Sequence, residues 1–259
     1  MFISRLSVSP EARLQTQLGS YVFSRQRELI LDLVSPNAGE RVLDICCGTG
    51  NYLKIFKEKW CSVAGIDHRP DNLQIARNKL GEGAELVAGQ ADDLPFSDNE
   101  FDIVTIINAL EILPDPSKVI AEAIRVCRQR MFIGFINNFS VAGTKQKLKE
   151  IFGFPLNQNM RFFRLNEIKK MVGDSMGIPD IKWGSVIYFP TAFYSFLEEV
   201  EELMPLESNP LGAFTGLSFP IKYTYQTVQN PLDSPFKLGR KTKKAAQGAA
   251  RDMLKETNK

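Results

Sequence analysis

A short apolar run that passes through an acid into a glycine loop constrains this chain more than any other feature. Residues 41–45 read Arg-Val-Leu-Asp-Ile, residues 46–50 read Cys-Cys-Gly-Thr-Gly, and a helical pattern follows. A strand, a tight glycine turn and a helix in this order bring the backbone of an α/β domain close to a small ligand at the carboxyl end of its sheet. Gly48 and Gly50 have no Cβ to block that approach, and the N–H groups of the helix start point into the same space.

A second acid follows at the spacing that nucleoside-binding folds use. Asp67 closes the strand-like run at residues 62–66, about 20 residues after the loop. A carboxylate there can accept hydrogen bonds from both hydroxyls of a ribose. The loop lacks the third glycine of a dinucleotide fingerprint, and Asp44 precedes it where a pyrophosphate would be repelled. Asp44 instead suits a positively charged ligand group, such as an amino group or a sulfonium.

Strand and helix patterns alternate along the chain after residue 36. The strand-like stretches are 41–45, 62–67, 85–88, 101–107 and 131–136, and the helical ones are 14–34, 53–59, 71–80 and 116–127. Such alternation predicts right-handed crossovers and a doubly wound, mostly parallel α/β sheet. The later stretches predicted are a helix at 165–176, a strand at 182–189, a helix at 193–203 and a strand at 212–225.

Length, charge and cysteine usage exclude several classes of protein. No apolar run is long enough to cross a bilayer, and the first residues lack the apolar core of a signal peptide, so we expect a cytoplasmic protein. Four cysteines without a C-x-x-C pair and a single histidine predict no metal site. Residues 237–259 hold eight basic and two acidic residues, which leaves 24 basic and 28 acidic residues, a net charge of −4, on the remainder. That mildly acidic remainder disfavours nucleic-acid binding.

Four motifs in order resemble those of the class I S-adenosylmethionine-dependent methyltransferases. The first two are VLDICCGTG at 42–50 and GIDHRPDNLQIAR at 65–77, and the others lie at 89–102 and 108–116. The chain is similar to the branch that includes the ubiquinone and menaquinone C-methyltransferases, most closely over residues 21–137 and more weakly to about residue 225. The resemblance implies a Rossmann-like sheet of seven strands with an antiparallel last strand. It also implies S-adenosyl-L-methionine as cofactor and a small-molecule methyl acceptor.

The resemblance also implies which residues contact the cofactor. The loop backbone would hold the methionine part, with Asp44 and Asn108 near its amino group, Asp67 on the ribose and His68 against the adenine edge. Gln90 stands where the family commonly has an acid that accepts from the adenine amino group, and a Gln carbonyl can accept the same bond. The implied contacts are Tyr21, Arg25, Asp44, Cys46, Gly48, Asn51, Asp67, His68, Gln90, Ala91 and Asn108.

Residues after the fourth strand usually touch the reacting centre in this family. A methyltransferase of base amino groups would have an Asn/Asp-Pro-Pro-aromatic run there, which this chain lacks. Relatives often carry a histidine just after this point, and Glu111 occupies that neighbourhood. Glu111 is therefore the candidate general base, and a solvated carboxylate near Pro114 is the ordinary alternative.

The chain divides by pattern into an N-terminal helical cap (1–36), a methyltransferase domain (37–232) and a basic tail (233–259). The domain contains an insertion at 137–163, rich in Phe and Lys, and we expect acceptor specificity to lie there and in the helix that bears Tyr21. Two other functions stay open, a nucleotide-dependent oxidoreductase and a cofactor-binding protein without catalysis. The accepting atom and the formation of a homodimer stay open as well.

Overall fold

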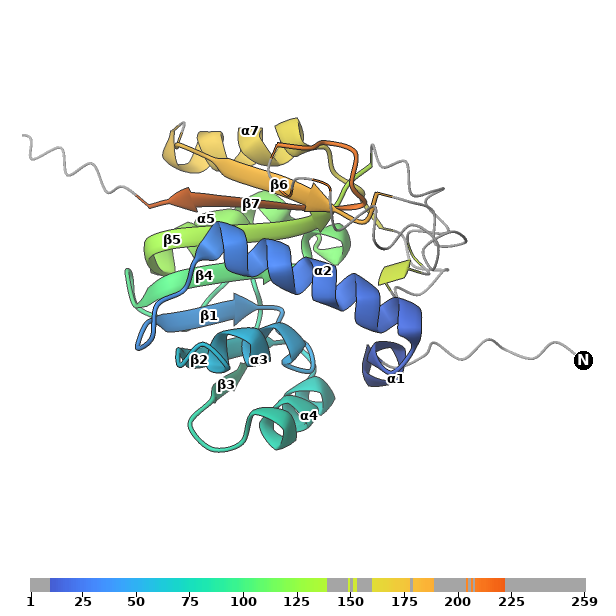
Figure 1. The fold of residues 1–259 in the computed structure, drawn as a ribbon. Helices are drawn as coiled ribbons and strands as arrows, with labels where there is room; N and C mark the ends of the chain where they lie inside the picture. The colour runs from blue at the N-terminus through green and yellow to red at the C-terminus, as the bar shows by residue number, and fades with distance from the viewer. Residues whose placement is uncertain are drawn as a thin grey trace, which may run out of the picture. The chain divides into compact units, whose positions relative to one another are not determined.

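Seven strands form one sheet in this computed structural model, which describes residues 10–138, 149, 151–152, 160–177, 179–188, 204, 206 and 208–221. Their order in the sheet is β3-β2-β1-β4-β5-β7-β6 (Figure 1). Only β7 runs antiparallel to its neighbours β5 and β6. The strands are β1 (Arg41–Ile45), β2 (Ser62–Asp67), β3 (Glu85–Ala88), β4 (Phe101–Ile107), β5 (Cys127–Ile136), β6 (Lys182–Val186) and β7 (Phe214–Pro220). The predicted fold, with its antiparallel last strand, is confirmed.

The helices follow the predicted pattern with one break near the start of the chain. They are α1 (Pro10–Leu14), α2 (Gln17–Val34), α3 (Asn51–Lys57), α4 (Pro70–Leu80), the 3-10 turn η1 (Leu110–Ile112), α5 (Pro116–Val126) and α7 (Leu165–Met176). The helix predicted at 14–34 begins later because Thr16 caps it, its side chain accepting from the Gly19 N–H at 3.0 Å. The helix predicted at 193–203 lies outside the described residues.

The helices cover the sheet in two layers. Leu29 of α2, Phe56 of α3 and Leu73 of α4 join one cluster of buried apolar side chains, while Val119 of α5 and Ile168 of α7 join the other. In Figure 1, α2 and α3 lie in front of the sheet, and α5 and α7 lie on its other side. None of the described helices is long and apolar enough to cross a membrane.

The carboxyl ends of the central strands meet at one edge of the sheet. Ile45 pairs with Ile66 on β2 and with Ile106 on β4, so the three strands end side by side. The tip of β1 points toward the end of the molecule where α1 and the first turns of α2 lie (Figure 1). Residues that follow β1, β2 and β4 therefore converge below the N-terminal helices.

Candidate functional site

The loop after β1 is built on left-handed backbone. Cys46, Gly48 and Gly50 have φ angles of 59°, 52° and 77°. These angles are sterically unfavourable for a residue that has a Cβ, but not for glycine. A Cβ built on Gly48 has no atom of the described residues within 4 Å, so those residues leave this side of the loop open. A Cβ on Gly50 would lie 3.1 Å from the Cβ of Ala76, because the loop packs closely on α4. The predicted open approach is present at Gly48.

Asp67 holds the loop in place from the end of β2. Its Oδ2 accepts from the N–H of Gly48 at 2.9 Å. Its Oδ1 accepts from the N–H of Arg69 at 2.9 Å and from Nδ2 of Asn72 at 3.2 Å. A carboxylate has about four acceptor positions, so one remains for a ligand hydroxyl. The expectation that Asp67 receives both ribose hydroxyls stays untested, and the carboxylate also has a structural role that the sequence does not reveal.

Asp44 lies buried at the floor of the same edge, with only 2% of its surface exposed. Thr105, its register partner on β4, donates to Oδ1 at 2.6 Å. Burial raises the pKa of Asp44 to about 7, the hydroxyl of Thr105 opposes that shift, and the nearby negative charge of Asp67 adds to it. A carboxyl in this state gains most from a ligand that brings a positive charge.

A chain of hydrogen bonds joins α2, α3 and the residue after β4. The hydroxyl of Tyr52 donates to Oε1 of Gln26 at 2.8 Å and accepts from Nδ2 of Asn108 at 2.7 Å. Nε2 of Gln26 and Oδ1 of Asn108 are buried and have no hydrogen-bond partner among the residues that the structure describes. Burial raises the pKa of Tyr52, and the negative charges of Asp44 and Glu111 raise it further, so the hydroxyl keeps its proton.

Glu111 is buried, contrary to the expectation of a solvated carboxylate near Pro114. Only 2% of its surface is exposed, because the turn η1 directs it back to the end of β5. Its Oε1 accepts from the N–H of Ile136 at 2.5 Å, and its Oε2 is buried without a partner in the described part of the chain. Burial raises the pKa of Glu111 to about 7, although the backbone N–H groups that it accepts from favour the charged form. A carboxyl with this pKa can exchange a proton near neutral pH.

The other predicted residues lie at differing depths around this edge. Tyr21 and Arg25 are buried on α2, and Arg25 forms an ion pair with Glu28. The thiol of Cys46 is partly buried, and burial, followed by the charges of Asp67 and Asp44, raises its pKa to about 12. The thiol therefore stays protonated, and the loop backbone is what Cys46 offers to a ligand.

The adenine side of the predicted site is more exposed. His68 has 58% of its side chain exposed, and its Nδ1 lies 3.9 Å from Oδ1 of Asp67. The N–H of Gly89 donates to the backbone carbonyl of Asp67 at 3.2 Å, which brings the residues after β3 next to β2. There Gln90 is exposed and forms a backbone bridge with Asp93, whereas Ala91 is buried.

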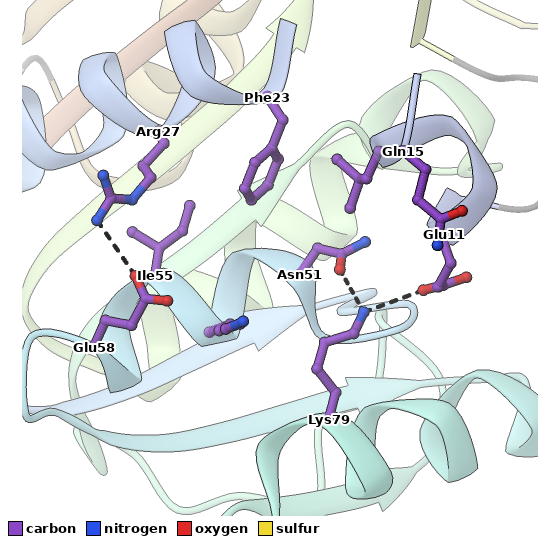
Figure 2. A pocket seen from close by; sticks show the side chains of 10 residues that line it. Glu11, Gln15, Phe23, Arg27, Asn51, Ile55, Glu58 and Lys79 are labelled. Atoms are coloured by element: carbon purple, nitrogen blue, oxygen red, sulfur yellow. Dashed lines mark hydrogen bonds and ion pairs between the residues drawn. The ribbon is translucent and has the colours of Figure 1, made fainter. Parts of the chain in front are cut away.

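A cavity of about 540 Å³ lies beside the loop rather than over Asp44 and Asp67. Figure 2 shows Phe23 and Arg27 of α2 on one side of it, with Ile55 of α3 and Glu58, the residue after α3, opposite. At its other end Nζ of Lys79 binds Oε1 of Glu11 at 3.1 Å and the side-chain oxygen of Asn51. Of the predicted site residues, Asn51 lines this cavity, and it does so with its oxygen already engaged by Lys79. The strand ends are the better candidate site, because the acids Asp44 and Asp67 converge there and buried oxygens of Asn108 and Glu111 have no hydrogen-bond partner among the described residues.

Gln26, Tyr52, Thr105 and Lys79 were not predicted from the sequence. Thr105 gives a signal, since it is one polar residue within the apolar run of β4. The contacts of Gln26, Tyr52 and Lys79 join separate elements, so no local spacing identifies them.

Comparison with known proteins places this geometry among methyltransferases. Residues 43–133 match the family model described as "Methyltransferase domain". A demethylmenaquinone methyltransferase of Renibacterium salmoninarum is 35% identical over 104 residues, 40% of this chain and 44% of that protein. One from Listeria welshimeri is 29% identical over 160 residues, 58% of this chain and 68% of that protein. The chain thus spans less than half the length of the first relative and about two thirds of the second.

Solved structures share the fold. A Thermotoga maritima protein described as a SAM-dependent methyltransferase and possible histamine N-methyltransferase aligns with a TM-score of 0.60 at 21% identity, over 78% of this chain and 91% of its own. The magnesium protoporphyrin IX methyltransferase of Synechocystis, solved with bound SAH, aligns with a TM-score of 0.54 at 15% identity, over 80% of this chain and 88% of its own.

Proposed function

Because this chain belongs to the class I S-adenosylmethionine-dependent methyltransferases, we propose that it moves a methyl group from this cofactor to a small, apolar or aromatic acceptor. One observation carries the proposal. The open, left-handed loop at residues 46–50 lies between two buried acids, Asp44 and Asp67, at the ends of adjacent strands. This combination suits a nucleoside that also carries positive charge.

The residues at the strand ends fit the cofactor. Asp44 and the free carbonyl oxygen of Asn108 would receive its ammonium group, and the remaining acceptor position of Asp67 would receive a ribose hydroxyl. The open side of Gly48 leaves room for the methionine part. When bound, the cofactor supplies an electrophilic methyl group on a sulfonium. The protein then contributes orientation and the exclusion of water, which in-line displacement requires.

Glu111 is our proposal for the group that takes a proton from the acceptor. Its unpartnered Oε2 is the atom that would accept the proton, while the Ile136 N–H holds Oε1. The turn η1 places Glu111 after β4, at the same edge as Asp44. The pKa of about 7 means that much of the carboxyl is ionised, and so able to accept a proton, at neutral pH or above.

The acceptor class rests on the names of the relatives. The relatives from Renibacterium and Listeria are named as demethylmenaquinone methyltransferases, so a reduced quinone with an unmethylated ring position is the first acceptor to try. The insertion at 137–163 and α2 with Tyr21 are proposed to form the acceptor wall. Most of 137–163 and all of the basic tail at 233–259 lie outside the described residues.

Calorimetry with S-adenosylmethionine, S-adenosylhomocysteine and NAD tests the cofactor. We expect binding of both sulfur nucleosides and none of NAD, whereas binding of NAD alone would favour an oxidoreductase. Transfer of a labelled methyl group to a panel of reduced quinones then tests the reaction. Tight binding of S-adenosylhomocysteine without transfer to any acceptor in the panel would favour a cofactor-binding protein without catalysis.

A further inference from the structure

We propose that Tyr52 and Gln26 are positioning residues that fix the Asn108 amide so that its carbonyl oxygen receives the ammonium group of the cofactor. This inference rests on the proposed function, because it assigns residues that hold the same cofactor. Neither Tyr52 nor Gln26 is a predicted contact. Gln26 acts through Tyr52, Tyr52 acts through Asn108, and only Asn108 reaches the ligand.

The direction of the hydrogen bonds determines which end of Asn108 is free. A tyrosine hydroxyl has one proton, and that of Tyr52 donates it to Oε1 of Gln26 at 2.8 Å. Tyr52 can then only accept from Asn108, which donates through Nδ2 at 2.7 Å. The amide oxygen Oδ1 is left as a buried acceptor for which the described residues provide no donor. This series of hydrogen bonds therefore presents an acceptor, not a donor, at the end of β4.

The backbone of Asn108 holds this amide at a defined point. Its φ angle of 51° is left-handed, a conformation that Asn tolerates better than most residues. Its N–H donates to the carbonyl of Gly134 on β5 at 2.9 Å. With the main chain fixed to β5 and Nδ2 fixed to Tyr52, the amide has little rotational freedom. A ligand donor that binds Oδ1 therefore meets an acceptor that is already oriented.

Electrostatics favours the same direction once a cation is bound. If Gln26 and Asn108 both flipped, the hydrogen bonds would reverse and Asn108 would present its NH₂ to the ligand. An ammonium group would be repelled by that NH₂ and attracted by the carbonyl oxygen, so cofactor binding selects the observed direction. Burial, together with the negative charges of Asp44 and Glu111, raises the pKa of Tyr52 and keeps its hydroxyl protonated, which this series of hydrogen bonds requires.

A purely structural role is the competing explanation. Gln26 is 2% exposed, so its bond to Tyr52 also ties α2 to α3. A tether of this kind would change stability and would affect every ligand of the site equally. A positioning role affects only ligands that carry the ammonium group.

Tyr52→Phe separates the two roles. The variant keeps the ring, whose centroid lies 5.6 Å from that of Phe23, and removes only the hydroxyl. Calorimetry should compare S-adenosylhomocysteine with 5′-methylthioadenosine, which lacks the whole amino-acid part. We expect Tyr52→Phe to weaken the first about five- to tenfold and the second no more than about twofold. Gln26→Met should produce a smaller loss with the same selectivity.

Tyr188→Phe is the matched control. It removes another buried tyrosine hydroxyl, one that donates to the carbonyl of Ser185 on β6, and should leave both affinities unchanged. Equal losses for the two ligands in Tyr52→Phe, or no loss for either, would overturn the positioning role. Failure of the wild-type protein to bind either nucleoside would instead remove the proposed function, which distinguishes the two failures.

Discussion

Replacing Asp44 by Asn should stabilise the ligand-free protein at neutral and alkaline pH while weakening cofactor binding. The substitution keeps the size of the side chain and an oxygen that can accept from Thr105, which now donates at 2.6 Å. It removes the ionisable group. The experiment therefore isolates the cost of holding a buried negative charge at the end of β1.

The magnitude follows from the pKa of Asp44. Burial raises it from its ordinary value of 3.8 to about 7, and three pKa units correspond to roughly 4 kcal/mol. The folded protein holds this proton more tightly than the unfolded chain, so the free energy of unfolding falls as the pH rises from about 4 to about 7. Asp44→Asn should lack this component. Its stability relative to the wild type should grow over that interval and reach roughly 4 kcal/mol above it.

Urea unfolding of both proteins at pH 5, 6, 7 and 8, without ligand, measures the difference. Asp102→Asn is the control of opposite sign. Burial raises the pKa of Asp102, but hydrogen bonds from the Arg41 N–H and from Arg128 outweigh it and leave the pKa lowered. Asp102→Asn should therefore destabilise the protein by a similar amount at every pH from 8 to 5, because that loss shrinks only below the ordinary aspartate pKa of 3.8, toward the lowered pKa of Asp102.

A rise in pH should strengthen cofactor binding, whereas it should lower the stability of the ligand-free protein. Affinity of the wild type for S-adenosylhomocysteine should rise with pH through about 7, because ionised Asp44 attracts the ammonium group. Asp44→Asn should bind about 30-fold or more weaker at pH 8, with a flatter pH profile. A stability difference of equal size at pH 5 and pH 8, or a destabilised Asp44→Asn at pH 8, would refute the reasoning.

Substitutions at three further residues test other parts of the site. Asp67→Ala should cost on the order of 2–4 kcal/mol of cofactor affinity and should also loosen the loop that it holds at Gly48; unchanged affinity in a folded variant would mean that the ribose is held elsewhere. Gln90→Asp should keep or tighten cofactor binding and Gln90→Leu should weaken it, whereas equal affinities would show that the side chain does not face adenine. Glu111→Gln should lower the methyl-transfer rate about 10²-fold with unchanged affinity for S-adenosylhomocysteine, a pattern that a lost general base gives and a damaged cofactor site does not.

The strands of the fold could be predicted from the sequence because each one is a short apolar run bounded by turn residues. The runs 41–45, 62–67, 85–88 and 101–107 coincide with β1 to β4. Strand β5 begins at Cys127, before the predicted residue 131, and the prediction missed this part because residues 128–130 are polar. The sequence pattern used to predict strands reflects side-chain hydrophobicity, so it misses the polar end of a strand.

The site could be predicted only in part, for a physical reason. Asp44, Asp67 and Asn108 follow strand patterns directly, so topology alone places them at one edge. The hydrogen bond between Tyr52 and Gln26 depends on how α2 packs against α3, and the burial of Glu111 depends on how η1 packs against β5. The spacing of residues along the sequence does not reveal such packing. Such non-local polar contacts become visible only when the layers are assembled.

The contrast between Asp44 and Asp102 indicates what the site is built to receive. Both are aspartates of neighbouring strands with 5% or less of their surface exposed, although Asp44 is the more deeply buried of the two. Asp102 lies beside the guanidinium of Arg128, and its pKa is lowered, whereas the pKa of Asp44 is raised to about 7. No ion pair to Asp44 occurs within the described part of the chain. Buried carboxylates are stable when a cation neutralises them, so the carboxyl end of the sheet is destabilised until a cationic ligand arrives. We expect a cofactor with an ammonium group and a sulfonium to supply that charge, and part of its binding energy to come from relieving the cost at Asp44.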